Sequence, residues 1–288
     1  MSLLEISGLT VRAGATAVVD DVSFALAPGE RLGLIGESGS GKSVTSLAAV
    51  GLLPGGLTPS GSIRLDGREV VGASDAALRP LRGPVAQLVF QEPLTALDPL
   101  MRVGAQIAEP IRRHRGLRGR ALSDAVAAAL DEVALPEPRI ARSYPHELSG
   151  GQRQRVAIAI ALAAHPRLLI ADEPTTALDV TVQDGVLSLL ERLVAERDMA
   201  LLFISHDLAV VARMTERIVV LRHGVAVEEG PVDRVLRAPQ HPYTAALVAS
   251  ARALDDALDA GVPASGEAAG GAGAASGEAS ASGEEGRA

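Results

Sequence analysis

Hydrophobic and polar residues along the chain form patterns that predict strands alternating with helices. Residues 3–11 and 17–26 alternate apolar and polar side chains, which is typical of antiparallel strands. Apolar runs typical of buried strands lie at residues 31–35, 85–90, 167–171, 200–205 and 217–221, and a short strand with a turn is expected at 61–67. Helical spacing of apolar residues predicts helices at residues 44–50, 104–114, 121–134, 153–164 and 182–196. This order favours an α/β fold with a mostly parallel core sheet.

The same patterns divide the chain into five segments. Residues 1–91 are expected to form the first part of the core, including an N-terminal antiparallel β-subdomain, and residues 165–235 its second part. Between them, residues 92–164 predict an inserted α-helical subdomain. Residues 236–260 would form a C-terminal extension. Residues 261–288 consist largely of Gly, Ala, Ser and Glu, with almost nothing to bury, and are expected to be a disordered tail.

Residues 36–43 read Gly-Glu-Ser-Gly-Ser-Gly-Lys-Ser, which fits the phosphate-binding loop of nucleotide hydrolases. The glycines permit positive φ angles, so that successive backbone N–H groups can turn toward phosphate oxygens. Lys42 can reach the β- and γ-phosphates, and the Ser43 hydroxyl can bind Mg²⁺. A predicted strand precedes the loop and a predicted helix follows it, which places the phosphates at a helix N-terminus and disfavours a chance match in a Gly/Ser-rich turn.

Two adjacent carboxylates, Asp172 and Glu173, follow the buried strand predicted at 167–171. Ligands of open α/β sheets bind at the carboxyl ends of strands. Asp172 can therefore hold Mg²⁺ through water, and Glu173 can polarise an attacking water as a general base. The alternative is a surface Asp-Glu pair that only ends the strand, and the nearby phosphate-binding loop makes it the weaker reading.

The pentapeptide Leu-Ser-Gly-Gly-Gln at residues 148–152 stands directly before the helix predicted at 153–164. The Ser149 hydroxyl and the backbone N–H groups of the two glycines can bind an anion, with the helix dipole behind them. The alternative is an ordinary serine N-cap flanked by glycines.

Composition narrows the classes of protein that fit. The chain has 288 residues and no cysteine, which excludes disulfides and thiolate metal sites and is typical of a reducing cytosol. The formal net charge is −8, so a nucleic-acid partner is not expected. No apolar run is long enough for a transmembrane helix and no signal peptide is apparent, so any membrane role is expected to come through a partner.

Taken together, these motifs resemble those of the ATP-binding subunits of ABC transporters over residues 3–250. The resemblance implies a P-loop NTPase (RecA-like) core. It also implies that Gln91 is the Q-loop glutamine that senses Mg²⁺ and attacking water, that Asp179 is the D-loop aspartate at a dimer interface, and that His206 is the switch histidine that contacts the γ-phosphate. From the residues alone, Gln91 could be a polar strand end, Asp179 a helix N-cap and His206 a structural histidine.

The resemblance implies ATP and Mg²⁺ as cofactors. Catalysis would depend on Glu173, His206, Gln91 and Lys42. The ATP contacts would be Gly36, Glu37, Ser38, Gly39, Ser40, Gly41, Lys42, Ser43, Val44, Thr45 and Gln91. The Mg²⁺ ligands would be Ser43, Gln91 and Asp172. The signature residues would act in trans, on the nucleotide of a second ATPase subunit joined head to tail; they are Ser149, Gly150, Gly151 and Gln152.

A narrower resemblance, to the oligopeptide, dipeptide and nickel importers, rests on residues 90–99, 144–148, 175–183 and 238–246. Val44 and Gln91-Glu-Pro are similar to the first of the two different ATPase subunits of such importers. This implies two permease subunits in the membrane, an extracytoplasmic solute-binding protein, and a peripheral place on the cytoplasmic face of the cell membrane. The second ATPase subunit is expected to be a different chain, with a second copy of this chain as the alternative. Peptide is the expected cargo, with nickel or another small solute as alternatives.

Two departures from the family pattern stand out. Most members place an aromatic residue near position 13 to stack on adenine, whereas residues 11–14 here are Val-Arg-Ala-Gly. Some relatives carry a C-terminal cysteine cluster for iron–sulfur binding, which a chain without cysteine cannot form. The alternative functions are a soluble non-transport ABC ATPase of translation or DNA repair, and a P-loop kinase, which would not need the pentapeptide at 148–152.

Overall fold

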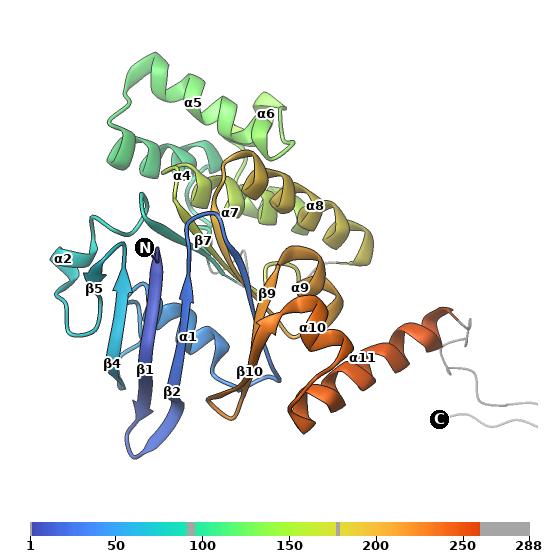
Figure 1. Ribbon diagram of the computed structural model, residues 1–288. Coiled ribbons are helices and arrows are strands. Elements are labelled where there is room, and N and C mark those ends of the chain that lie inside the picture. Colours follow the sequence, from blue (N-terminus) through green and yellow to red (C-terminus); the bar gives the residue numbers. More distant parts are fainter. Residues whose placement is uncertain (1, 91–95, 177–178, 260–288) are drawn as a thin grey trace, which may run out of the picture. The chain divides into compact units, whose positions relative to one another are not determined.

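The computed structural model describes residues 2–90, 96–176 and 179–259, and its strands form two sheets (Figure 1). The first sheet has the strand order β2-β1-β4-β5 and the second the order β10-β9-β3-β8-β7-β6. The first sheet consists of β1 (Leu4–Ala13), β2 (Thr16–Leu26), β4 (Leu57–Leu65) and β5 (Arg68–Glu69). The second consists of β3 (Arg31–Ile35), β6 (Ala86–Val89), β7 (Leu168–Asp172), β8 (Ala200–Ser205), β9 (Arg217–Arg222) and β10 (Val225–Pro231).

The first sheet confirms the predicted antiparallel β-subdomain. Strand β1 pairs with β2 on one side and with β4 on the other, both in antiparallel orientation. Strand β4 begins four residues earlier than the sequence predicts, because its pairing with β1 continues from Leu4–Leu65 as far as Ala13–Leu57. A strand partner thus extends an element that the local pattern alone does not delimit.

The second sheet is parallel except at one edge. Strands β6, β7, β8, β3 and β9 pair in parallel, and β10 pairs with β9 in antiparallel orientation. Strand β10 was not predicted from the sequence. It forms because the two-residue turn of His223 and Gly224, which have φ angles of 49° and 82°, folds the chain directly back onto β9.

Helices occupy most of the chain between the strands. They are α1 (Lys42–Ala49), α2 (Asp75–Leu78), α4 (Val103–Pro110), η1 (Ile111–Arg115), α5 (Gly119–Glu132), α6 (Pro138–Arg142), η2 (Pro145–Glu147), α7 (Gly150–Leu162), α8 (Val180–Glu196), α9 (Leu208–Met214), α10 (Val232–Arg237) and α11 (Pro242–Asp259). The helix predicted at 104–114 ends as an α-helix at Pro110 and continues as a wider helical turn, η1. Proline has no N–H to donate and its ring displaces the preceding carbonyl, which disrupts regular α-helical bonding.

The second sheet separates two hydrophobic clusters, as expected for a layered α/β core. Leu169 and Ala171 of β7 belong to a cluster with helices α4, α5, α7 and α8, whereas Leu168 and Ile170 belong to a cluster with α1 and the first sheet. Successive residues of a strand point to opposite faces, so one apolar strand serves both clusters. Helices α4, α5 and α7 of the insertion share the first cluster with Phe203 of β8.

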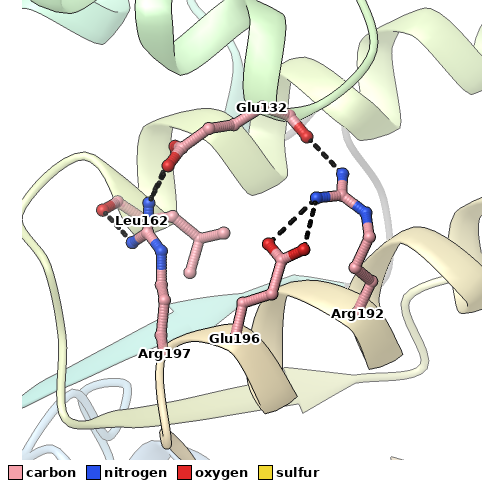
Figure 2. A network of polar contacts seen from close by, with 5 residues as sticks. All are labelled: Glu132, Leu162, Arg192, Glu196 and Arg197. Carbon is pink, nitrogen blue, oxygen red and sulfur yellow. Dashed lines mark hydrogen bonds and ion pairs between the residues drawn. The ribbon is translucent and has the colours of Figure 1, made fainter.

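A polar network ties the inserted helices to the core (Figure 2). The Arg197 guanidinium binds the Glu132 carboxylate at 2.7 Å and 2.8 Å and donates to the Leu162 carbonyl at 3.1 Å. Arg192 donates to the Glu132 backbone carbonyl at 2.8 Å and pairs with Glu196 on its own helix. The network therefore joins the C-terminal ends of α5, α7 and α8, where carbonyls without helical partners need donors.

Residues 2–251 form one compact unit, and the chain from Arg252 onward belongs to a second. Within the first unit, Glu228 of β10 anchors the segment that leads into α11. Its carboxylate accepts hydrogen bonds from the N–H groups of Gln240, at 2.9 Å, and His241, at 3.0 Å. Burial raises the pKa of Glu228, but these two N–H donors together lower it, and the net pKa lies below its ordinary value of 4.5.

Glu228→Gln is expected to lower the free energy of unfolding at pH 7 by about 1 kcal/mol, because the amide keeps only one oxygen acceptor for the two backbone donors and carries no charge. The folded-state pKa is depressed, so the carboxylate stabilises the fold above pH 4.5 and this contribution is lost as the pH falls through the folded-state pKa. The difference between variant and wild type should therefore shrink in urea unfolding below pH 4.5. Glu5→Gln, on the exposed face of β1, is the control and should show neither effect.

Candidate functional site

The sheet register brings three predicted site segments to one edge. The phosphate-binding loop follows β3, Glu173 follows β7 and His206 follows β8. These strands are parallel neighbours, with Ile35 paired to Ser205 and Asp172 paired to Ile204. Their carboxyl ends therefore lie side by side, at the sheet edge where ligands of α/β proteins bind.

The backbone of the loop at residues 36–43 requires glycine at two positions. Gly36 has a φ of 156°, and a Cβ added there would lie 2.2 Å from the Leu221 carbonyl oxygen. Gly41 has a φ of 97° and caps helix α1, and a Cβ there would lie 2.8 Å from the Val18 carbonyl oxygen. The expected helix N-terminus behind the loop is present, so that α1 directs its unpaired N–H groups toward the loop.

The Lys42 ammonium is buried, with only 5% of the residue exposed. Its Nζ donates to the Gly36 carbonyl at 2.7 Å and to the Glu37 carbonyl at 2.9 Å. Burial lowers the pKa of Lys42 from its ordinary value, against the opposing influence of Glu173, Asp172 and Glu37. A poorly hydrated cation at a glycine-rich loop is well suited to bind a phosphate oxygen.

Asp172, at the end of β7, is buried beside the first turn of α1. Its Oδ1 accepts from the Ser43 hydroxyl at 3.1 Å and its Oδ2 from the Ser46 hydroxyl at 3.3 Å. Burial raises the pKa of Asp172, and the two hydroxyl donors oppose that rise. The Ser43 hydroxyl and this carboxylate are the hard oxygen ligands that Mg²⁺ prefers, so this pair fits the expected metal.

Mg²⁺ usually keeps several waters and shares its ligands with substrate phosphates. Across the ranges that the structure describes, no group of three or more His, Asp and Glu is placed to hold a metal ion by itself.

Glu173 is held in an unusual backbone conformation. It has a φ of 46°, which is rare for a residue with a side chain, and its N–H donates to the Ile204 carbonyl at 2.9 Å. Its Oε2 accepts from the Thr176 hydroxyl at 3.0 Å, and its Oε1 lies 3.2 Å from Nδ1 of His206. The carboxylate and the imidazole thus form a pair that lines the same cavity as the loop, an arrangement suited to accepting a proton from water.

A cavity of about 790 Å³ opens over these residues, within the size range of ligand sites. It is lined by Val18, Gly36, Glu37, Ser38, Gly39, Gly41, Lys42, Ser43, Val44, Glu173, Thr176, His206 and Leu247. A second hollow of about 430 Å³ includes Arg167 and Arg197, which already pair with Asp66 and Glu132. The first cavity therefore is the candidate site.

Two predicted elements lie outside this lining. Ser149 and Gln152 form a capping box at the start of α7, in which the Ser149 hydroxyl accepts from the Gln152 N–H at 3.3 Å and the Gln152 side chain accepts from the Ser149 N–H at 3.0 Å. Asp179 caps α8 by accepting from Val182 N–H at 3.0 Å. Ser149 and Asp179 are therefore helix N-caps within this chain. Their roles toward a second subunit stay predictions.

The residues predicted for the site and the residues that line the cavity agree only in part. Gln91 lies outside the described residues. Ser40 and Thr45 are buried and lie outside the cavity lining, and the Thr45 hydroxyl donates to the Gly41 carbonyl at 2.9 Å. The residues that the sequence did not predict are Val18, Ser46, Thr176 and Leu247. Ser46 lies one helical turn after Lys42. Thr176 belongs to the stretch 175–183 that carries the family resemblance, but no site role was predicted for it. No motif marked Val18 and Leu247, which reach the cavity through the fold.

The position expected to bind adenine has no aromatic residue. Arg12, near the end of β1, donates to the Ala15 carbonyl at 3.2 Å across the turn between β1 and β2. Val18, two residues into β2, lines the cavity. Val18 therefore offers an aliphatic contact, in place of an aromatic one, to a base that enters the cavity.

Comparison with known proteins gives consistent matches along the chain. A family model described as ABC transporter matches residues 19–176, and one described as oligopeptide/dipeptide transporter, C-terminal region, matches residues 227–277. Putative peptide import ATP-binding proteins of Brucella ovis and Brucella melitensis are each 47% identical, over 89% of this chain and 80% of the relative.

Solved structures agree with these sequence matches. A dimeric ATP-binding cassette in a post-hydrolysis state, bound to ADP and Pi, is similar with a TM-score of 0.71 and 30% identity, over 80% of this chain and 98% of that one. A dimeric bacterial ABC transporter cassette is similar with a TM-score of 0.70 and the same identity and coverage. Over 80% of the chain, the fold is therefore similar to that of a cassette that binds ADP and Pi.

Proposed function

Because the chain belongs to the ABC transporter family, we propose that it is the ATP-hydrolysing subunit of a peptide importer. The observation that carries this proposal is the cavity that the phosphate-binding loop lines together with Glu173 and His206. The names of the relatives and the match to the oligopeptide/dipeptide transporter C-terminal region support the import of peptides. Nickel or another small solute is the alternative cargo.

The phosphate groups of ATP would bind the loop. Backbone N–H groups of the loop and the first turn of α1 donate to phosphate oxygens, and Lys42, which donates to the Gly36 and Glu37 carbonyls, also donates to the β- and γ-phosphates. Ser43 and Asp172 would hold Mg²⁺, and Gln91 is proposed as a further ligand. When bound, this ion supplies positive charge that offsets the charge developing on the transferred phosphoryl group.

Glu173 is proposed as the general base. Its carboxylate accepts a proton from the attacking water, and the Thr176 hydroxyl and His206 imidazole fix its orientation. His206 lies on the same rim and would donate to the γ-phosphate. Positioning and electrostatics thus supply the catalysis, as is usual for phosphoryl transfer.

A second ATPase subunit would complete the site. Ser149 is exposed and lies outside the lining of this chain's own cavity, and Val180, beside Asp179, is 84% exposed. The two similar cassettes are described as dimeric, which supports a head-to-tail pair in which Ser149, Gly150, Gly151 and Gln152 meet the partner's nucleotide and Asp179 lies at the interface. A different ATPase chain is the proposed partner, and a second copy of this chain is the alternative.

The remaining partners would be two permease subunits and an extracytoplasmic solute-binding protein. The helices in the described part of the chain include none that is long and apolar enough to cross a membrane. We therefore propose peripheral attachment to the cytoplasmic face of the cell membrane, through permeases that contact the inserted helices.

Affinity purification of the tagged full chain from detergent-solubilised membranes tests this proposal. Recovery of two permeases and a second ATPase chain, identified by mass spectrometry, is the expected result. Recovery of ribosomes or DNA in place of permeases would instead favour a soluble ABC ATPase of translation or DNA repair. Radiolabelled peptide uptake by vesicles that hold the purified complex then distinguishes peptide from nickel.

A further inference from the structure

The start of helix α11 reaches the phosphate-binding loop from the far end of the sequence. The phenol oxygen of Tyr243 accepts a hydrogen bond from the backbone N–H of Glu37 at 3.0 Å. Leu247, four residues later and therefore on the same face of the helix, lines the cavity together with Glu37 and Lys42. The chain's C-terminal segment thus forms part of the wall of the nucleotide site.

Tyr243 is held rigidly enough to set the position of its hydroxyl. Only 8% of the residue is exposed, and the Arg222 guanidinium carbon lies 5.0 Å from its ring centroid. Its N–H donates to Nδ1 of His241 at 3.1 Å, and the His241 N–H in turn donates to Glu228. Contacts from the end of β9 and from β10 therefore fix both the ring and the backbone of Tyr243.

Two groups hold the Glu37 residue, one at each end of its backbone. Tyr243 accepts from its N–H, and Lys42 donates to its carbonyl at 2.9 Å. Lys42 is also the group expected to bind phosphate, and its three N–H donors then serve the phosphate as well as the Gly36 and Glu37 carbonyls. The Tyr243 hydroxyl holds the Glu37 N–H without any contact to Lys42, so this bond does not depend on where the Lys42 ammonium points.

We propose that Tyr243 is a positioning residue for nucleotide binding. Its hydroxyl keeps the first peptide of the loop in the phosphate-receiving conformation while Lys42 also binds the phosphates. Fixing the loop before binding lowers the ordering cost that a nucleotide must otherwise offset. The inference rests on the proposed function and adds to it a direct link between the C-terminal segment and nucleotide affinity.

Tyr243→Phe removes only the oxygen and keeps the ring beneath Arg222. The dissociation constants of MgATP and ADP for the full chain, measured by calorimetry, are expected to rise about fivefold to tenfold, as for the loss of one hydrogen bond. Turnover at saturating MgATP should change by less than about twofold, because the groups that bind water are untouched. Tyr144→Phe, which alters the other tyrosine in the sequence, is the matched control and should change neither value.

A spectroscopic readout tests the contact itself. The sequence has no tryptophan and two tyrosines, so in Tyr144→Phe all intrinsic tyrosine emission arises from Tyr243. ADP is expected to change this emission saturably, with a midpoint equal to the calorimetric dissociation constant. In Tyr243→Phe, where emission comes from Tyr144, ADP should leave it constant.

The outcomes separate this inference from the proposed function. If wild type binds MgATP and Tyr243→Phe binds it equally well, Tyr243 does not position the loop. If wild type binds neither nucleotide, the proposed function fails, and the inference fails with it.

Discussion

Glu173→Gln is expected to lower steady-state ATP hydrolysis by about two to four orders of magnitude, the usual contribution of a general base, while MgATP still binds. The amide has the shape of the carboxylate and keeps an oxygen that can accept from Thr176, but it cannot take a proton from water. Phosphate release at saturating MgATP measures the loss, and calorimetry measures the binding. The assay needs the assembled complex, because the proposed site contains a second ATPase subunit.

Glu196→Gln is the control for this variant. Glu196 lies on α8, its side chain is 56% exposed and it pairs with Arg192, away from the loop. Its hydrolysis rate should equal that of wild type. Unchanged turnover in Glu173→Gln would show that another group activates the water.

Glu173→Gln also identifies the second ATPase subunit, because blocked hydrolysis should trap a nucleotide-bound dimer. Size-exclusion chromatography with light scattering, with and without ATP, is the measurement. A dimer that forms only with ATP would show that this chain pairs with itself. A monomer that binds ATP would point to a different ATPase chain, and a monomer that does not bind ATP would show that Val18 and its neighbours cannot replace the aromatic residue missing near Ala13.

Lys42→Met is expected to raise the dissociation constant of MgATP by about a hundredfold, since charge-assisted hydrogen bonds to phosphate are lost. The buried position of Lys42 makes this effect larger than for a cation exposed to water. The thermal unfolding midpoint without nucleotide should change little, because burial already penalises the charged form, as its lowered pKa indicates. Arg68→Met, at an exposed cation on β5, is the control.

The sequence offers a second measurement for this site, because Lys42 is its one lysine. Amine-reactive acetylation followed by peptide mass spectrometry should therefore report on Lys42 and the N-terminal amine alone. MgATP is expected to slow modification of Lys42 and to leave the N-terminal rate unchanged. Equal Lys42 rates with and without MgATP would contradict the proposed contact with phosphate.

Several features of the fold followed from local patterns. The strand at 200–205 was predicted with its observed bounds, and the loop at 36–43 was predicted between a strand and a helix, as observed. Elements with a strong local signal, such as uninterrupted apolar runs and glycine spacing, depend little on distant residues. The wider turn η1 after Pro110 could not be read from apolar spacing, which continues through it.

Strand β10 and the start of β4 illustrate the opposite case. Residues 225–231 include two glutamates, a glycine and a proline, so their own pattern does not predict a strand. Pairing with β9 through the turn at His223 and Gly224 makes them one. Tertiary pairing overrides local preference wherever the backbone groups of a neighbouring strand need partners.

The sequence by itself determined which chemical groups this protein has for nucleotide binding: the loop, Lys42, the Asp172–Glu173 pair and His206. Each is recognisable because its chemistry requires particular residue types at short spacing. Only the tertiary structure decided which groups share a cavity. The strand register sets Glu173 3.2 Å from His206, and the return of the chain through β9 and β10 brings Tyr243 within 3.0 Å of Glu37. Such contacts join residues far apart in sequence, and packing of the whole chain, not local pattern, fixes their distances.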